Sequence, residues 1–337
     1  MTVVNKIKIA GIGSYVPERI MTNFDFEKIV DTSDEWITTR TGIKKRHFAS
    51  ESEASSDFAI KASIIALKDA KMDPKDIDLV IVGTATPDML FPSTACIVAS
   101  ALGCVNSTAF DISAGCSGFV FSLSIAVQYL RTGHFKNALI IGTEALSKFL
   151  DFSNRETSVL FGDGAGAMVL RNIETDTNDD DAIVALITGS DGSGGNKLLL
   201  PAGGSRMPAS IQTVKNHLHY VHMEGKEIFK FAVRISDTIV DTLLKNTNLT
   251  IESIDHYLFH QANIRILDSA VKRLNIPWEK VIVTIDEYGN TSSAAIPMAL
   301  SISSSSGRIK KNDLILIAVF GAGLTWGGAI LRWNKDE

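Results

Sequence analysis

Parts of the first half of this chain return, in the same order, in its second half. The two members of each match lie at similar separations along the chain, but the last match has the shortest separation. The segment that leads to this last match is therefore longer in the first half than in the second. One such match could arise by chance, but three in order predict a duplicated structural unit. The matches are residues 71–86 with 248–263, 136–142 with 311–318, and 164–171 with 327–332, which align Ile77 with Ile254, Lys136 with Lys311 and Arg171 with Arg332.

Each unit is predicted to alternate helices with short buried strands. Ala59–Ala70 has apolar residues at helical spacing, and the apolar run Leu79–Val82 follows it. Val233–Lys245 and Tyr257–Phe259 repeat that order in the second half. Short apolar strands that alternate with helices indicate an α/β fold with mixed sheets covered on both faces. Two such units would pack helix to helix, and loops at equivalent ends of the two sheets would converge on one site.

We expect the halves to span residues 1–172 and 173–337, joined near the acidic and polar segment Glu174–Asp181, which is typical of a solvated linker. Asp191–His222 is predicted to be irregular, and a loop of that length usually carries binding surface or a lid. It contains three histidines but no matching set of Cys or carboxylate ligands, so we expect no metal site there. The histidines are His217, His219 and His222.

Composition narrows the classes of function. The chain has 337 residues, 45% of them hydrophobic, and a formal net charge of −5. This charge argues against general attraction to nucleic acid or to anionic membranes. Its three cysteines suggest neither a disulfide framework nor a metal knuckle, which fits a reducing compartment. Met1–Ala10 is too short and polar for a signal peptide, and no apolar run could cross a membrane, so we expect a cytoplasmic protein.

Cys116 has the surroundings of a nucleophile. Small residues flank it on both sides, an apolar stretch precedes it, and Phe119–Leu130 follows with helical periodicity. This pattern predicts a tight strand-to-helix turn that places a thiol at the start of a helix, where partial positive charge favours the thiolate. An open thiolate can accept an acyl group. A buried structural cysteine is the competing interpretation.

The duplication suggests partners for Cys116. The separation that aligns Lys136 with Lys311 also aligns Cys116 with Thr291, so the polar turn at Asn290–Ser293 would be the counterpart of the nucleophile turn. His260 likewise follows the predicted strand of the second unit. A Cys, a His and an Asn on converging loops form a plausible acyl-transfer site. Alternatively, His260 is structural and Asn290 serves only a turn with left-handed backbone.

The Gly-rich turn at Phe320–Gly327 follows an apolar strand and could bring backbone N–H groups close to a ligand. Together with the Cys116 N–H, it could form an oxyanion hole. Nucleotide binding is the alternative, but the turn lacks the Lys-Ser/Thr of a phosphate loop. The other Gly pair, Gly11 and Gly13, fails the dinucleotide pattern because Val16 stands at the third Gly position.

Taken together, these motifs resemble β-ketoacyl-acyl-carrier-protein synthase III, the initiating condensing enzyme of fatty acid synthesis in the thiolase superfamily. The resemblance covers nearly the whole chain and implies a thiolase-like fold of αβαβα layers. The segments that carry it are 31–43, Phe91–Ser93, Ala114–Phe119, Phe161–Gly166, His260–Asn263, Gly289–Ser292 and Phe320–Trp326.

The resemblance implies a catalytic triad of Cys116, His260 and Asn290. Chain-elongating relatives carry two His and thiolases carry a second, late Cys, whereas here no Cys follows Cys116. Cys116 would accept the acyl group of an acyl-CoA, with the backbone N–H groups of Cys116 and Ala322 as oxyanion hole. His260 and Asn290 would then stabilise the enolate formed when malonyl carrier protein loses carbon dioxide. This chemistry needs no metal or redox cofactor.

The family also implies binding roles for exposed residues. Trp36 and Arg155 would sandwich the CoA adenine, and Arg40 would meet its phosphates. Phe91 would cross a homodimer interface into the partner's acyl pocket. Trp36 could instead be partly buried core and Arg155 part of a surface ion pair, and the basic docking residues could form an ordinary solvated face. Asn263 completes the implied CoA site, and the implied docking surface for the acidic carrier protein consists of Lys230, Arg265, Lys272 and Arg273.

Some positions depart from the family. Gly115 stands where many relatives have Ala, and Ser293 where Ala is usual; residues 173–182 and 203–222 are longer than in compact members. These departures leave acyl-chain length and branching preference open. Other functions remain in competition: a condensing enzyme of secondary metabolism with another acyl acceptor, a cysteine hydrolase of thioesters or amides, and a non-enzymatic CoA-binding module.

Overall fold

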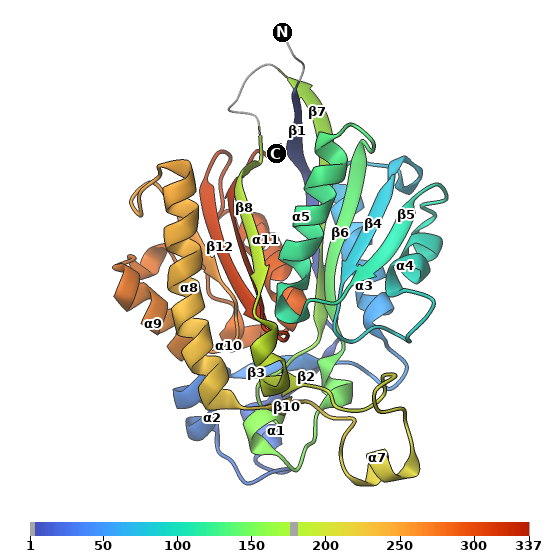
Figure 1. Ribbon diagram of the computed structural model, residues 1–337, viewed down its shortest axis with the longest axis vertical. Coiled ribbons are helices and arrows are strands. Elements are labelled where there is room, and N and C mark those ends of the chain that lie inside the picture. Colours follow the sequence, from blue (N-terminus) through green and yellow to red (C-terminus); the bar gives the residue numbers. More distant parts are fainter. Residues whose placement is uncertain (1–3, 176–180, 337) are drawn as a thin grey trace.

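The computed structural model describes residues 4–175 and 181–336, and it has five layers (Figure 1). The first sheet contains five strands, in the order β1 (Val4–Tyr15), β7 (Gly164–Thr175), β6 (Asn137–Glu144), β4 (Leu79–Gly83) and β5 (Thr108–Ile112). The second sheet has the order β11 (His256–Phe259), β12 (Leu314–Gly321), β13 (Thr325–Arg332) and β8 (Ile183–Ser190).

Helices form the other three layers. The central pair contacts both sheets and consists of α5 (Gly118–Arg131) and α11 (Ala295–Ser305). The outer face of the first sheet is covered by α3 (Ser55–Asp69) and α4 (Thr94–Leu102). The outer face of the second is covered by α8 (Gly225–Thr247) and α9 (Ile264–Leu274). This arrangement confirms the αβαβα fold.

The central layer explains why both faces of each sheet are apolar. One face of α5 buries Phe119, Leu123 and Leu130 completely, and they pack with residues of both sheets. All five residues of β4 are buried, so this strand has no solvent-facing side. Burial of this kind contributes about 25 cal/mol per Å² of apolar surface removed from water. Burial of apolar surface between the layers therefore stabilises this five-layer arrangement.

The strand pairings show the duplication directly. In the first sheet β4 and β6 are parallel and Leu79 pairs with Ala138; in the second, β11 and β12 are parallel and His256 pairs with Ile315. Since Leu79 corresponds to His256, Ala138 corresponds to Ile315.

One of the three sequence matches was out of register. The alignment of Lys136 with Lys311 would have placed Ala138 at Asp313, so this match was wrong by two positions. In the first half Asn137 of β6 pairs with Arg171 of β7, and in the second half Leu314 of β12 pairs with Arg332 of β13. Since Asn137 corresponds to Leu314, Arg171 corresponds to Arg332, which confirms the third match. In place of β5, the second half has a parallel bridge from Tyr257 to Val281.

The longer connection of the first half lies between β6 and β7. It spans residues 145–163 and includes the short helix α6 (Arg155–Ser158), whereas residues 322–324 alone join β12 to β13. β7 continues to Thr175, past the predicted boundary at 172, and most of the predicted acidic linker lies outside the described residues.

Shorter elements surround one end of the two sheets (Figure 1). They share an apolar cluster that includes Phe26, Ile37 and Phe48. The elements are β2 (Arg19–Thr22), α1 (Asn23–Phe26), α2 (Asp34–Thr41), β3 (Lys45–Phe48) and α10 (Ile285–Tyr288).

Residues 191–222 are more ordered than predicted. They include β9 (Leu198–Leu199), which pairs with β10 (His222–Met223), and the short helix α7 (Ile211–Lys215). Among the described residues, no helix is both long and apolar enough to span a bilayer.

Candidate active site

The nucleophile turn is a short 3₁₀ segment, Gly115–Ser117, between β5 and α5. A second 3₁₀ segment, Ser292–Ala294, precedes α11 in the other half. Gly115 and Ser292 begin the two segments and both have φ +51°. The turn therefore repeats in the same register as the strands, and the counterpart of Cys116 is Ser293. The predicted counterpart, Thr291, was wrong because it relied on the alignment of Lys136 with Lys311.

The Gly-rich turn after β12 packs directly against the nucleophile turn. A Cβ atom on Gly321 would lie 2.4 Å from the backbone nitrogen of Cys116, and one on Gly115 would lie 2.7 Å from that of Ala322. Only glycine at both positions allows the two backbones to come this close. The backbones of Cys116 and Ala322 thus meet in space, and their joint use as an oxyanion hole stays a prediction.

His260 follows the last residue of β11, where its backbone N–H donates to the Ala318 carbonyl at 2.8 Å. Its ring lies edge-on to Phe320, with ring centres 5.1 Å apart. The side chain is 1% exposed, and Nδ1 is buried without a hydrogen-bond partner. Burial lowers the pKa of His260 to about 3, so the imidazole is neutral near pH 7.

Asn290 follows α10 and is fixed by its backbone and its side chain. Its N–H donates to the Leu160 carbonyl at 2.9 Å, and its own carbonyl accepts from Gly162 at 3.0 Å. The side-chain Oδ1 accepts the Ser292 N–H at 2.9 Å, which leaves the Nδ2 hydrogens as donors. Positive φ in this turn occurs at Gly289 (+64°) and not at Asn290, so the part of the alternative that gave Asn290 a left-handed backbone was wrong, whereas its Oδ1 does close a turn with the Ser292 N–H.

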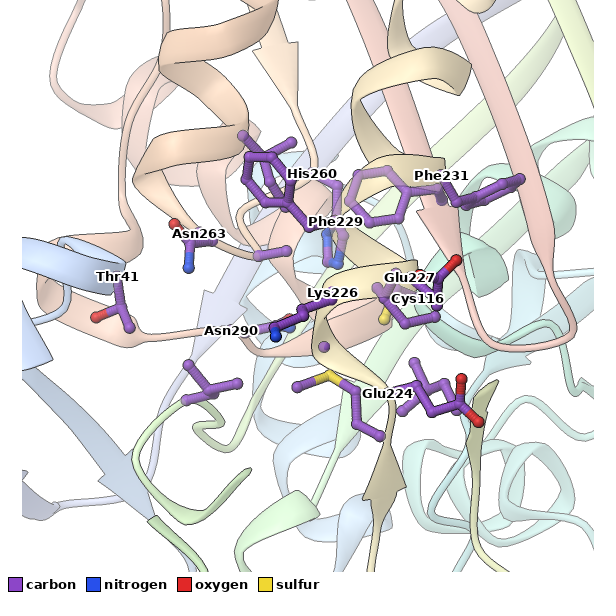
Figure 2. A pocket seen from close by; sticks show the side chains of 18 of the residues that line it. Thr41, Cys116, Glu224, Lys226, Glu227, Phe229, Phe231, His260, Asn263 and Asn290 are labelled. Atoms are coloured by element: carbon purple, nitrogen blue, oxygen red, sulfur yellow. The ribbon is translucent and has the colours of Figure 1, made fainter. Parts of the chain in front are cut away.

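Cys116, His260 and Asn290 line one pocket of about 640 Å³ (Figure 2). They come from three separate segments: the 3₁₀ turn before α5, the end of β11 and the loop after α10. The structure therefore brings together the three residues that were predicted to cooperate.

The expectation that Cys116 rests as a thiolate was wrong. Burial raises the pKa of the thiol to about 12; the Glu144 carboxyl raises it as well, and the neighbouring Ser292 hydroxyl opposes this only in part. Desolvation outweighs the positive end of the helix because Cys116 is buried, with 8% of the residue exposed. In the free protein the sulfur is thus protonated, and its proton must leave as a thioester is attacked.

The mouth of the pocket contains most of the predicted CoA residues. Trp36, Arg40 and Asn263 line it, and Asn263 also caps α9 by accepting the Arg265 N–H at 2.9 Å. Arg155 lies outside the lining, but its guanidinium stands 5.1 Å from the centre of the Trp36 ring. A base between two contacting planes needs about 7 Å, so Arg155 must move before an adenine can enter. CoA binding by these residues stays a prediction.

The predicted docking residues have different environments. Arg265 is exposed and lines the mouth of the pocket. The other three form ion pairs: Lys230 with Glu227, Lys272 with Asp268, and Arg273 with Asp237. Phe91, which was predicted to reach a partner's acyl pocket, is 83% exposed and does not line the pocket of its own chain.

Three kinds of lining or supporting residue were missed from the sequence. The predicted helix began at Val233, but α8 begins at Gly225 and contributes Lys226, Phe229 and Phe231 to the pocket. Ile228 and Phe231 continue the apolar spacing of the helix toward its start, and this signal could have revealed them. Leu198 comes from the segment that was predicted to be irregular, and Met223 directly follows that segment. The third kind is Glu144, the one charged residue of β6, which stands at the end of that strand.

Within the described parts of the chain, no group of three or more His, Cys, Asp or Glu residues could hold a metal ion. The three neighbouring histidines each have another partner: His217 meets Asp151 at 2.8 Å, His219 meets Thr213 at 2.9 Å, and His222 meets the His217 carbonyl at 3.3 Å.

The buried imidazole predicts a specific pH dependence of stability. The pKa of His260 falls from 6.5 to about 3 on folding, so between these values the unfolded chain binds a proton that the folded chain does not. The contribution of His260 is complete above about pH 6.5 and is lost as the pH falls. We expect His260→Asn to lose less unfolding free energy between pH 7 and pH 5 than the wild type does, as measured by urea denaturation. Equal losses would contradict neutral burial.

Comparisons with known proteins identify the family of this chain. Residues 110–192 match the family described as 3-oxoacyl-[acyl-carrier-protein] synthase III, and residues 244–333 match its C-terminal part. The chain is 53% identical to the β-ketoacyl-[acyl-carrier-protein] synthase III of Caldanaerobacter subterraneus subsp. tengcongensis, over 97% of this chain and 98% of that protein. It is 52% identical to that of Clostridioides difficile, over 98% and 99%.

A crystal structure of 3-oxoacyl-[acyl-carrier-protein] synthase III from Aquifex aeolicus superposes with a TM-score of 0.87 at 44% identity, covering 97% of this chain and 99% of that one. The terms 3-oxoacyl and β-ketoacyl describe the same group. Sequence and fold agree over almost the full length, and the chain belongs to the β-ketoacyl-[acyl-carrier-protein] synthase III family.

Proposed function

We propose that this protein condenses an acyl-CoA primer with malonyl-acyl-carrier protein, with loss of carbon dioxide, and so initiates fatty acid synthesis. The observation that carries the proposal is one pocket lined by a thiol, a neutral imidazole and a carboxamide, namely Cys116, His260 and Asn290. The residues Trp36, Arg40 and Arg265 at its mouth suit a negatively charged, nucleotide-bearing substrate.

In the first half-reaction, the Cys116 sulfur attacks the thioester carbonyl of acyl-CoA. The bond to the CoA sulfur breaks, and the thiol proton of Cys116 ends on the departing CoA. The backbone N–H groups of Cys116 and Ala322 donate hydrogen bonds to the transient oxyanion. Fixed donors stabilise the transition state most where they meet the charge that develops in it. The product is an acyl-Cys116 thioester.

In the second half-reaction, the malonyl thioester carbonyl accepts hydrogen bonds from His260 and Asn290. A neutral imidazole has one N–H, which we assign to Nε2 because Nδ1 is buried. Loss of carbon dioxide leaves an enolate whose oxygen these donors stabilise. Its carbon attacks the acyl-Cys116 carbonyl, the β-ketoacyl product leaves, and the released thiolate takes up a proton.

For the nucleotide end of CoA, we propose that Trp36 and Arg155 separate to hold the adenine between them, with Arg40 and Asn263 beside them. Trp36→Ala should raise the KM for acyl-CoA about tenfold, because stacking on one base is worth about 1–3 kcal/mol. The KM for an acyl-N-acetylcysteamine thioester, which lacks the nucleotide, should not change. Trp278→Ala is a matched control because this exposed Trp lies outside the pocket lining. Equal effects on both thioesters would contradict adenine stacking.

Exposed basic and apolar side chains support proposals for two protein partners, the carrier protein and a second copy of this chain. We propose that Arg265, with Lys230, Lys272 and Arg273, docks the acidic carrier protein beside the pocket. We also propose a homodimer that covers the exposed apolar run Met89–Phe91. A protein with three free cysteines and CoA thioesters as substrates fits the cytoplasm. The halves proposed to have arisen by duplication remain residues 1–172 and 173–337.

The decisive experiment separates loading from condensation. The intact protein is incubated with acetyl-CoA, a branched acyl-CoA and longer acyl-CoAs and is then weighed; an acyl mass on Cys116 is expected with at least one of them. Malonyl-carrier protein or malonyl-CoA is added next. A β-ketoacyl-carrier protein supports this function, a condensation product with another acceptor indicates secondary metabolism, and free acid without a new carbon–carbon bond indicates a hydrolase.

A further inference from the structure

A buried carboxyl group lies behind the nucleophile turn and has no part in the mechanism above. Glu144, the last residue of β6, is 0% exposed. No ion pair to it occurs among residues 4–175 and 181–336. Five neutral groups that can donate hydrogen bonds surround it instead: the Ala85 N–H at 3.1 Å and the hydroxyls of Thr84 at 3.4 Å, Thr86 at 2.7 Å, Ser292 at 3.0 Å and Ser293 at 3.0 Å.

These hydrogen bonds join the two halves of the molecule. Ala85 and Thr86 follow β4 of the first sheet, whereas Ser292 and Ser293 belong to the turn before α11. The Ser293 hydroxyl also lies 2.7 Å from the Gly83 carbonyl. The same turn holds Asn290, because the Ser292 N–H donates to Asn290 Oδ1 at 2.9 Å. Glu144 is thus two hydrogen bonds away from the carboxamide that faces the pocket.

We propose that Glu144 is a positioning residue that holds the Ser292–Ser293 turn, so that the Asn290 amide points at the malonyl thioester carbonyl. This inference rests on the proposed function and adds a residue to it. A carboxylate suits the place because it only accepts hydrogen bonds and has about four lone-pair sites for the donors around it. An amide in the same place would aim two N–H groups at some of those donors.

The position of Glu144 also gives a chemical signature. Burial raises the pKa of the Glu144 carboxyl, and the hydrogen bonds around it lower it. Ser292 lies beside the Cys116 sulfur, and an ionised Glu144 disfavours a second negative charge on that sulfur. The other titratable group of the site is His260 at the end of β11, which is neutral. On the side of α3, Asp57 is engaged with the Ala54 N–H and Asp88 with Ser56. Removing the charge of Glu144 should therefore lower the pKa of Cys116, which loss of packing alone would not do.

The test compares Glu144→Gln and Ser292→Ala with Ser122→Ala. Ser122 is the matched control: it is a fully buried hydroxyl on α5 that donates to the Gly118 carbonyl at 2.9 Å and has no contact with Glu144. Two readouts are needed. One is the rate at which iodoacetamide alkylates Cys116 as a function of pH, and the other is carbon dioxide release from malonyl-carrier protein by acyl-loaded enzyme.

For Glu144→Gln we expect the alkylation profile to move to lower pH by about half a unit or more, because the thiolate loses a repelling neighbour. Carbon dioxide release should fall about tenfold to a hundredfold, since small displacements of a catalytic donor have effects of this size. Ser292→Ala keeps the charge and the backbone, so it should lower carbon dioxide release without moving the profile to lower pH. Ser122→Ala should change neither readout.

An unchanged alkylation profile in Glu144→Gln, or carbon dioxide release as fast as in the wild type for both variants, would overturn the proposal. If Glu144→Gln does not fold, Ser292→Ala decides the matter through carbon dioxide release alone. Alkylation needs no acyl substrate, so it reports on Glu144 even where the proposed function fails. Wild-type enzyme that takes up acyl groups but never releases carbon dioxide would instead count against the proposed condensation.

Discussion

Cys116→Ala should gain no mass when it is incubated with acyl-CoA, whereas the wild type gains one acyl group. The variant has no sulfur to form the acyl thioester, so condensation stops at the first half-reaction. Its fold should persist, because removing one buried sulfur is a small large-to-small change that costs about 1–2 kcal/mol at most. Intact-protein mass spectrometry, with circular dichroism as a check on folding, makes the measurement.

The matched control for this variant is Cys96→Ala, since Cys96 is exposed and lies outside the pocket lining. It should load the acyl group as the wild type does. Cys116→Ala should also retain some carbon dioxide release from malonyl-carrier protein, because His260 and Asn290 remain in place. An acyl adduct of normal yield on Cys116→Ala would show that another residue is the nucleophile. The proposed mechanism through Cys116 would then be wrong.

The second large effect concerns the donors of the decarboxylation step. His260→Ala and Asn290→Ala should each reduce condensation about 10²–10³-fold, or about 3–4 kcal/mol in the barrier, because each removes one fixed donor from the enolate oxygen. Both variants should still be acylated on Cys116, since neither side chain is needed to hold the first oxyanion. Separate assays of acyl loading and of β-ketoacyl product distinguish the two steps.

His256→Gln is the control for the histidine variant. His256 begins β11, bonds to Asp313 at 3.0 Å and lies outside the pocket lining, so its replacement should leave both steps unchanged. If His260→Ala and Asn290→Ala slow loading and condensation in equal proportion, the two residues do not act specifically on the malonyl carbonyl, and their assignment as enolate donors is wrong.

Local patterns carried most of the fold prediction. The apolar run of β4 and the helical spacing of α3 can be read from short windows, because side-chain periodicity follows directly from helix and strand geometry. The duplication could be read as well, since equivalent strands keep similar residues. Its register could not: the match of Lys136 with Lys311 slipped by two positions, and only the strand pairings of Ala138 and Ile315 fixed it.

Candidate site residues were predicted to the extent that they sit in recognisable turns. Cys116 and His260 each follow a largely apolar strand and Asn290 lies in a Gly-Asn turn, and the structure brings all three to one pocket. The start of α8 was missed because its first two turns mix charged and apolar residues. Glu144 was missed because no local pattern distinguishes a carboxylate buried at the end of a strand from one at a solvent-exposed strand end.

The sequence by itself determined the elements, the duplicated architecture and the candidate nucleophile, because these depend on residues near one another in the chain. Only the tertiary structure decided the protonation of Cys116 and His260 and the role open to Glu144. A pKa depends on the water excluded and the charges brought near by all surrounding segments, and those segments come from residues as far apart as Thr84 and Ser292. A helix start alone therefore predicted a thiolate, whereas the assembled core holds a thiol.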